Sequence, residues 1–221
     1  MALPWTVLAR HDALEGVLEL RQRGDDFLIM IDKRVLMNSF SRSSEEALST
    51  LSLAPIAGKR EPKILVGGLG MGFTLRAALD VLPPGAQVLV AELNEVVLDW
   101  CKGPLGPATN HAVGDPRVTV QIGDVAHVIA ASPNRFDAIL LDLYEGPNDG
   151  SQGRNDPLYG AAALRKQRDA LLRGGVLGVW GEDKEPAYAK RFGAAGFDVT
   201  THAIGKGGRK HVVYIGKRRE T

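Results

Sequence analysis

Residues 62–75 read PKILVGGLGMGFTL, an apolar stretch that leads into a glycine-rich turn. The apolar residues predict a buried strand, and FTLRAALDVL, residues 73–82, predicts the helix after the turn. Between them, Gly68, Gly70 and Gly72 allow the backbone to turn tightly and to approach a ligand closely. In a parallel sheet with helical crossovers, such a turn lies at the crevice beside the carboxyl ends of the strands.

The alternation of strand and helix continues to the C-terminus. Further strands are predicted at 87–93, 117–124, 136–143 and 174–181, and further helices at 94–103, 125–132, 157–172 and 185–196. The last segment, 197–218, holds two strands around a Gly/Lys turn, and because no helix separates them they must pair antiparallel. The predicted fold class is therefore α/β, with a doubly wound, mostly parallel sheet and an antiparallel C-terminal hairpin.

A smaller β region precedes this sheet. Its strands are predicted at 17–23, 27–32 and 34–39. A helix over 43–58 follows, with Ser43 or Ser44 as its cap. We predict a small N-terminal β region with a linking helix at 1–58 and a Rossmann-like catalytic domain at 59–221.

The composition suits a globular protein, since 44% of the 221 residues are hydrophobic and 24% are charged. A net charge of +1 gives no electrostatic reason to expect nucleic acid or an anionic membrane as a partner. Charge appears at Arg10 before any secretory apolar core, and a single cysteine, Cys101, fits a reducing compartment, so we expect a cytoplasmic location. The histidines show no metal-ligand spacing, and no metal is expected.

Three classes of ligand compete for the glycine turn. A phosphate-binding P-loop needs a lysine near its end, and GGLGMGFT has none. The dinucleotide fingerprint requires GxGxxG, but the third glycine position counted from Gly68 is Phe73. A sulfonium nucleoside such as S-adenosylmethionine (AdoMet) remains, and the antiparallel C-terminal hairpin also favours an AdoMet-type sheet over an NAD-binding half.

Acidic residues stand at the ends of the next three predicted strands. Glu92 is placed to bind the two ribose hydroxyls, Asp124 to accept a hydrogen bond from the adenine amino group, and Asp142 to face the crevice. Each acid alone is as well explained by a helix N-cap or a solvated loop. Their occurrence at successive strand ends favours an adenosyl nucleoside.

In this order, the motifs resemble those of the spermidine synthases (polyamine aminopropyltransferases), which share the AdoMet-methyltransferase fold. The resemblance runs from about Phe27 to the fifth strand of the sheet, and it rests on TLR after the glycine turn, AELNEVVLDWCK, DPRVTVQIGDV and RFDAILLDLYEGPNDG. It implies AdoMet or decarboxylated AdoMet as donor, a small amine-bearing acceptor and a homodimer. By the same resemblance, Asp142 is the catalytic base and Glu145 the ligand of the amine substrate.

The departures from the family pattern concern substrate recognition. The family's glycine motif reads GGGDGG, and its aspartate holds the amino end of the aminopropyl group; that position is Met71 here. No carboxylate at this position can bind a primary ammonium or repel the carboxylate of ordinary AdoMet. The family's YHE motif is matched by SEE at 44–46, and an apolar Leu36 or Met37 stands near a position that is often polar in the family.

We therefore predict a spermidine-synthase-like transferase that alkylates a small amine-bearing acceptor by methyl or aminopropyl transfer. The residues predicted to lie against the donor are Gly68, Gly70, Met71, Gly72, Glu92, Asp124 and Asp142. The chemistry is assigned to Asp142 and Glu145. Two alternatives stay open: a catalytically silent, dimeric nucleoside-binding protein and an NAD-dependent oxidoreductase.

Overall fold

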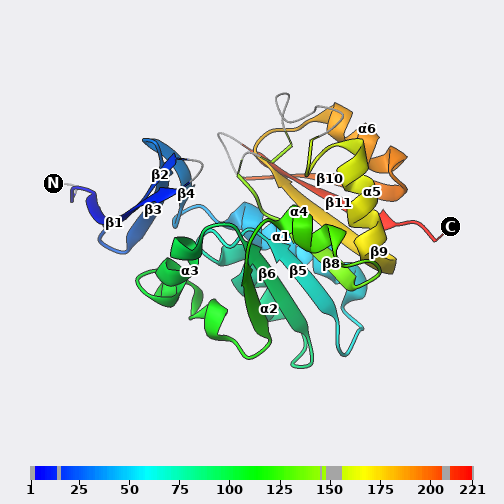
Figure 1. The fold of residues 1–221 in the computed structure, drawn as a ribbon, viewed down its shortest axis with the longest axis horizontal. Coiled ribbons are helices and arrows are strands. Elements are labelled where there is room, and N and C mark those ends of the chain that lie inside the picture. Colours follow the sequence, from blue (N-terminus) through cyan, green and yellow to red (C-terminus); the bar gives the residue numbers. More distant parts are fainter. Residues whose placement is uncertain (1–2, 14–15, 145, 148–155, 206–209, 221) are drawn as a thin grey trace.

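The structure is a computed structural model that describes residues 3–13, 16–144, 146–147, 156–205 and 210–220. Two sheets make up the strands of this part of the chain: a small antiparallel sheet near the N-terminus and a larger mixed sheet that follows it (Figure 1). Helices pack on both sides of the larger sheet, so the main body has three layers.

The larger sheet has the strand order β10-β11-β9-β8-β5-β6-β7. Its strands are β5 (Lys63–Gly67), β6 (Gln87–Glu92), β7 (Val118–Ile122), β8 (Phe136–Leu141), β9 (Leu171–Gly181), β10 (Phe197–Ile204) and β11 (His211–Arg218). Strands β5 to β9 pair in parallel, and β11 pairs antiparallel with both β9 and β10. The predicted α/β fold class is confirmed. The strand order reverses between β5 and β8, which is where a ligand crevice is expected in such sheets.

Helices cover both faces of the larger sheet (Figure 1). One face carries α1 (Ser43–Leu53), α2 (Phe73–Val81) and α3 (Glu95–Lys102), and the other carries α4 (Val125–Ala130), α5 (Ala161–Ala170) and α6 (Pro186–Ala194). Residues of β5 alternate between the two cores: Ile64 and Val66 pack on the first face and Leu65 on the second. This double coverage explains why the central strands are apolar throughout.

Several element boundaries differ from the sequence predictions: α1 ends at Leu53 rather than at 58, and α5 spans Ala161–Ala170 rather than 157–172. The N-cap of α1 is Arg42, not Ser43 or Ser44, and it makes no side-chain capping bond. The hydroxyl of Ser44 instead donates to the carboxylate of Glu45. Strand β9 begins at Leu171 rather than at 174, because Leu171 already pairs with β8 ahead of a bulge.

The linking helix α1 packs closely on the larger sheet. Gly178 of β9 makes this possible, since a Cβ there would lie 2.0 Å from the hydroxyl oxygen of Ser52. Ser49 of α1 donates a hydrogen bond to the carbonyl oxygen of Thr74 in α2, with a distance of 2.7 Å. Helix α1 is therefore held in a fixed position relative to β9 and the first turn of α2.

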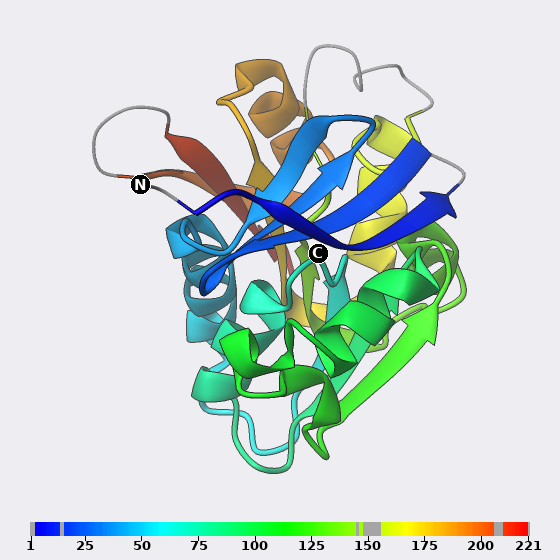
Figure 2. The same cartoon turned by 90° about the vertical axis from the view of Figure 1, so that its left-hand side faces the viewer.

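The N-terminal sheet is antiparallel and lies against one side of the main body (Figure 2). Its strands are β1 (Thr6–Ala13), β2 (Gly16–Arg23), β3 (Asp26–Ile31) and β4 (Arg34–Asn38). Strand β1 is absent from the sequence prediction because it is an edge strand with little buried surface and no clear alternation. Leu18, Leu20 and Ile29 of the inner strands join the core under α1 and α2.

Candidate functional site

The glycine turn between β5 and α2 lies beside the end of β8. The φ angles of Gly68, Gly70 and Gly72 are +87°, +51° and +84°, in the left-handed region that favours glycine. A Cβ on Gly68 would lie 2.2 Å from the carbonyl oxygen of Asp142. The structure thus brings together the turn and the acid at the point where the strand order reverses.

Met71 occupies the middle of this turn, and its side chain is fully buried in the core. Its backbone N–H points to the sulfur of Met37 on β4, with an N–S distance of 3.2 Å. A Cβ on Gly70 would lie 2.9 Å from the same sulfur. Met37 therefore links the N-terminal sheet to the turn, and the side chain of Met71 is not exposed to a ligand in this structure.

Cys101 supports the turn from α3. Its thiol donates to the carbonyl oxygen of Gly70, with an S–O distance of 3.3 Å, and burial raises the pKa of the thiol to about 12. A thiol with so high a pKa is not a nucleophile at neutral pH. Cys101 is therefore a packing residue.

Glu92 is the last residue of β6, and Asp124 follows β7. Their carboxylates contact different groups. The two carboxylate oxygens of Glu92 accept hydrogen bonds from the backbone N–H groups of Leu69 and Asn94, at 2.8 and 2.9 Å. Asp124 caps α4 by accepting from the N–H of Ala126 at 2.8 Å, and 43% of its side chain is exposed. Glu92 thus shapes the glycine turn, and both acids keep lone pairs with which they could bind a nucleoside.

Asp142 follows β8 and is partly buried. Its Oδ2 accepts a hydrogen bond from the hydroxyl of Thr74, with an O–O distance of 2.5 Å. Burial, and then the negative charge of Glu45, raise the pKa of Asp142 to about 7. A carboxylate that titrates near neutral pH is well suited to accept a proton from a substrate.

Glu45, in the first turn of α1, belongs to the SEE segment that matches the family's YHE motif, but the sequence analysis assigned it no role of its own. It is only 7% exposed, its Oε2 accepts from the hydroxyl of Ser44 at 2.7 Å, and burial raises its pKa. Acids in a first helical turn are usually solvated partners of the helix dipole, so the sequence offers no signal for its burial. Its proximity to Asp142 depends on the packing of α1.

The segment after β8 reaches the N-terminal sheet. The ring of Tyr144 is 45% exposed, and the guanidinium carbon of Arg34 on β4 lies 5.6 Å from the ring centroid. Glu145, the predicted ligand of the amine substrate, lies outside the described residues.

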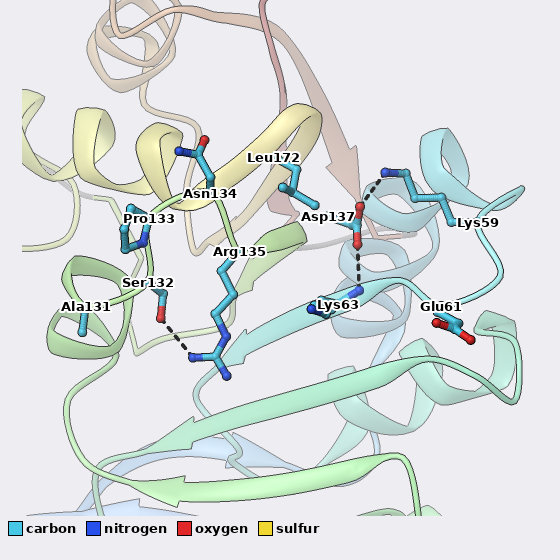
Figure 3. A pocket seen from close by; sticks show the side chains of 10 residues that line it. All are labelled: Lys59, Glu61, Lys63, Ala131, Ser132, Pro133, Asn134, Arg135, Asp137 and Leu172. Atoms are coloured by element: carbon cyan, nitrogen blue, oxygen red, sulfur yellow. Dashed lines mark hydrogen bonds and ion pairs between the residues drawn. The ribbon is translucent and has the colours of Figure 1, made fainter.

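A cavity of about 560 Å³ lies at the opposite ends of the central strands, where β5 and β8 begin (Figure 3). Its charged lining residues are Lys59, Glu61, Lys63, Arg135 and Asp137. The carboxylate of Asp137 accepts from Nζ of Lys59 at 2.5 Å and from the backbone N–H of Lys63 at 2.8 Å. Because the glycine turn and Asp142 stand at the other ends of these strands, the cavity is separate from the candidate site.

The described residues contain neither a metal-binding group nor a membrane-spanning helix. Within those ranges, no three histidine, cysteine, aspartate or glutamate side chains gather in a way that could hold a metal ion. No helix in the same part of the chain is long and apolar enough to cross a membrane.

Comparison with known families agrees with the crevice described above. The family model for the spermine/spermidine synthase domain matches residues 45–190, which is more than half of the chain. The chain belongs to the spermine/spermidine synthase family. The matched range contains the glycine turn, Glu92, Asp124 and Asp142, and the resemblance predicted from the motifs is confirmed.

Curated relatives of the chain are polyamine aminopropyltransferases. That of Clostridium tetani is 31% identical over 114 residues, which cover 52% of this chain and 38% of the relative. That of Saccharolobus islandicus is 26% identical over 161 residues, which cover 73% of this chain and 52% of the relative. The chain therefore matches 38% to 52% of the length of these two relatives.

Solved structures of spermidine synthases have the same fold. The spermidine synthase of Thermotoga maritima superposes with a TM-score of 0.76 at 18% identity, over 96% of this chain and 73% of that protein. A spermidine synthase in complex with the transition state analogue AdoDATO gives a TM-score of 0.75 at 17% identity, over 96% and 72%. At these identities the likeness shows the fold, which includes the small N-terminal sheet.

Proposed function

We propose that the protein is an aminopropyltransferase that uses decarboxylated AdoMet as donor and a small amine as acceptor. The observation that carries this proposal is the position of Asp142, beside the glycine turn at the end of β8, with a pKa near 7. Membership of the family and the names of the relatives support this reaction over methyl transfer and over a silent nucleoside-binding role.

The donor would lie across the carboxyl ends of β5 and β6. Gly68, Gly70 and Gly72 would pass close to its tail and ribose, where their left-handed backbone leaves room for a close approach. Glu92 would accept from the ribose hydroxyls, and Asp124 would accept from the adenine amino group with the oxygen that does not cap α4.

The protein would supply alignment and the removal of one proton, since the sulfonium of the donor already activates the carbon under attack. The carboxylate of Asp142 accepts a proton from the ammonium group of the acceptor. The free amine then forms a bond to the aminopropyl carbon next to sulfur, and the carbon–sulfur bond breaks with its electron pair going to sulfur. The products are methylthioadenosine and a secondary ammonium.

The decisive experiment is an assay of the purified protein with decarboxylated AdoMet or AdoMet and a series of linear diamines. We expect release of methylthioadenosine and an acceptor enlarged by one aminopropyl group, with the decarboxylated donor alone. A methylated acceptor and S-adenosylhomocysteine from AdoMet would instead establish methyl transfer. Binding of either nucleoside with no product from any acceptor would favour the silent binding protein.

The homodimer, the cytoplasmic location and the division at residues 58 and 59 remain predictions. Light scattering on the purified protein tests the first of them: a mass near twice the 23.7 kDa of the chain is expected. A mass near that of one chain would contradict it.

A further inference from the structure

Glu45 and Asp142 form a pair of acids with no lysine or arginine as counter-ion among the described residues, and the charge of His211 lowers the pKa of Glu45. Glu45 is buried, and its negative charge acts on Asp142. Among the described residues, no lysine or arginine forms an ion pair with either carboxylate, and their side-chain hydrogen bonds come from the hydroxyls of Ser44 and Thr74. Two adjacent acids shielded from water disfavour full ionisation unless a cation is supplied.

Buried polar atoms without hydrogen-bond partners lie on β9 and β11, which contact α1, and just before α5. Buried atoms that make no hydrogen bond include Oη of Tyr159, Nε1 of Trp180 and Nδ1 of His211. Tyr159 is 4% exposed, and the charge of Asp142 acts on its hydroxyl. The charge of His211 lowers the pKa of Glu45. The ring centroid of His211 lies 5.0 Å from that of Trp180. Buried polar groups are rarely left unpaired, so these atoms near the two acids indicate a place for a polar ligand.

The chemistry of the surroundings favours an organic ammonium ion over a metal ion. No third metal-ligating side chain joins the two acids in a metal-binding group within the described ranges. An ammonium group has three hydrogen-bond donors and can bind two carboxylates at once, with the alkyl chain along the apolar surface. The glycine turn, residues 67–72, offers no acid of its own, since it reads GGLGMG and the side chain of Met71 is buried in the core.

We propose that Glu45 is a specificity-determining residue that, together with Asp142, binds a primary alkylammonium group of a substrate. This inference rests on the proposed function and deepens it, since that reaction brings two such groups to the site. One is the end of the donor's aminopropyl chain, and the other is an amino group of the acceptor. In either case Glu45 would replace the acid that the glycine turn lacks.

Glu45→Gln tests this inference, with Glu46→Gln as the matched control. Glu46 lies on the same helical turn, but it is exposed and pairs with Arg42. Glutamine keeps the shape of Glu45, and burial already favours its neutral form, so the variant should fold; thermal unfolding checks this. The readout is the ratio of the dissociation constants of methylthioadenosine, which has no ammonium group, and decarboxylated AdoMet, measured by calorimetry.

If the ammonium belongs to the donor, the wild type and Glu46→Gln bind decarboxylated AdoMet about tenfold or more tightly than methylthioadenosine, and Glu45→Gln loses this preference. If it belongs to the acceptor, Glu45→Gln keeps the preference but weakens the binding of a diamine to the protein saturated with methylthioadenosine. The inference is wrong if Glu45→Gln changes neither. Turnover by the wild type, measured separately, would then still support the proposed function, whereas a wild type that binds none of these ligands contradicts both.

Discussion

Strand β8 has an aspartate at each end, and the two differ in their counter-charges. Asp137, at the beginning, is buried and binds Nζ of Lys59 and the backbone N–H of Lys63. Asp142, just after the end, accepts from the hydroxyl of Thr74 and stands near a second acid. The residues between them are apolar, so the difference arises from the elements packed around each end of the strand.

The comparison separates a structural carboxylate, Asp137, from Asp142, which we propose to be the reactive one. A cation and a backbone N–H satisfy Asp137, and its charge helps to hold the start of β5 against β8. The charge of Asp142 is unfavourable in the unliganded site, because burial and Glu45 both oppose it. Such a group gains most from a substrate that brings a positive charge or a proton, which is the behaviour expected at a functional site.

The largest expected effect is on turnover. Asp142→Asn should lower the rate of methylthioadenosine release about 10²- to 10⁴-fold, because it removes the proton acceptor while keeping the shape of the side chain. Asp137→Asn should leave the rate unchanged. Steady-state kinetics of both variants, with calorimetry to check nucleoside affinity, make the comparison. Full activity in Asp142→Asn would remove the basis of the proposed mechanism.

For stability, the larger effect is expected from the substitution of Asp137. Asp137→Asn should lower the free energy of unfolding by about 1–3 kcal/mol, since a buried hydrogen-bonded charge is lost and the N–H of Lys63 is left with a weaker acceptor. The ion pair with Lys59 contributes little to this free energy, because 48% of the Lys59 side chain is exposed to solvent. Asp142→Asn should cost little or be stabilising at pH 8. Urea denaturation measures the free energy of unfolding of each variant. An equal loss in Asp137→Asn and Asp142→Asn would contradict the assignment of a structural role to Asp137 alone.

A smaller effect is expected in the pH dependence of stability. The raised pKa of Asp142 means that the folded protein binds this proton more tightly than the unfolded chain does. Its contribution to stability is therefore complete below about pH 4 and is lost as the pH rises through about 7, by at most about 1.4 kcal/mol per pH unit. Urea unfolding across this range should show a flatter profile for Asp142→Asn. Superimposable profiles would mean that the pKa is not raised.

The sequence was sufficient for the main sheet and for bringing the glycine turn together with Glu92 and Asp142. Periodicity located the strands, and a glycine turn followed by acids at strand ends is a local pattern that parallel topology converts into one site. Strand β1 was not predictable in this way, because an exposed edge strand has no hydrophobic alternation. The early start of β9 at Leu171 also depends on a partner, since Leu171 pairs with Phe136.

By itself, then, the sequence determined the α/β fold, the family, and the residue types at the glycine turn and after each strand. Only the tertiary structure decided which acids share a site. Glu45 and Asp142 lie far apart in the chain, and they meet because α1 packs over β9 at Gly178 and against the first turn of α2. The tertiary structure likewise gave Asp137 a cation, whereas none of the described residues supplies one to Asp142. Burial and counter-charge depend on every neighbouring element, and no local pattern in a sequence records them.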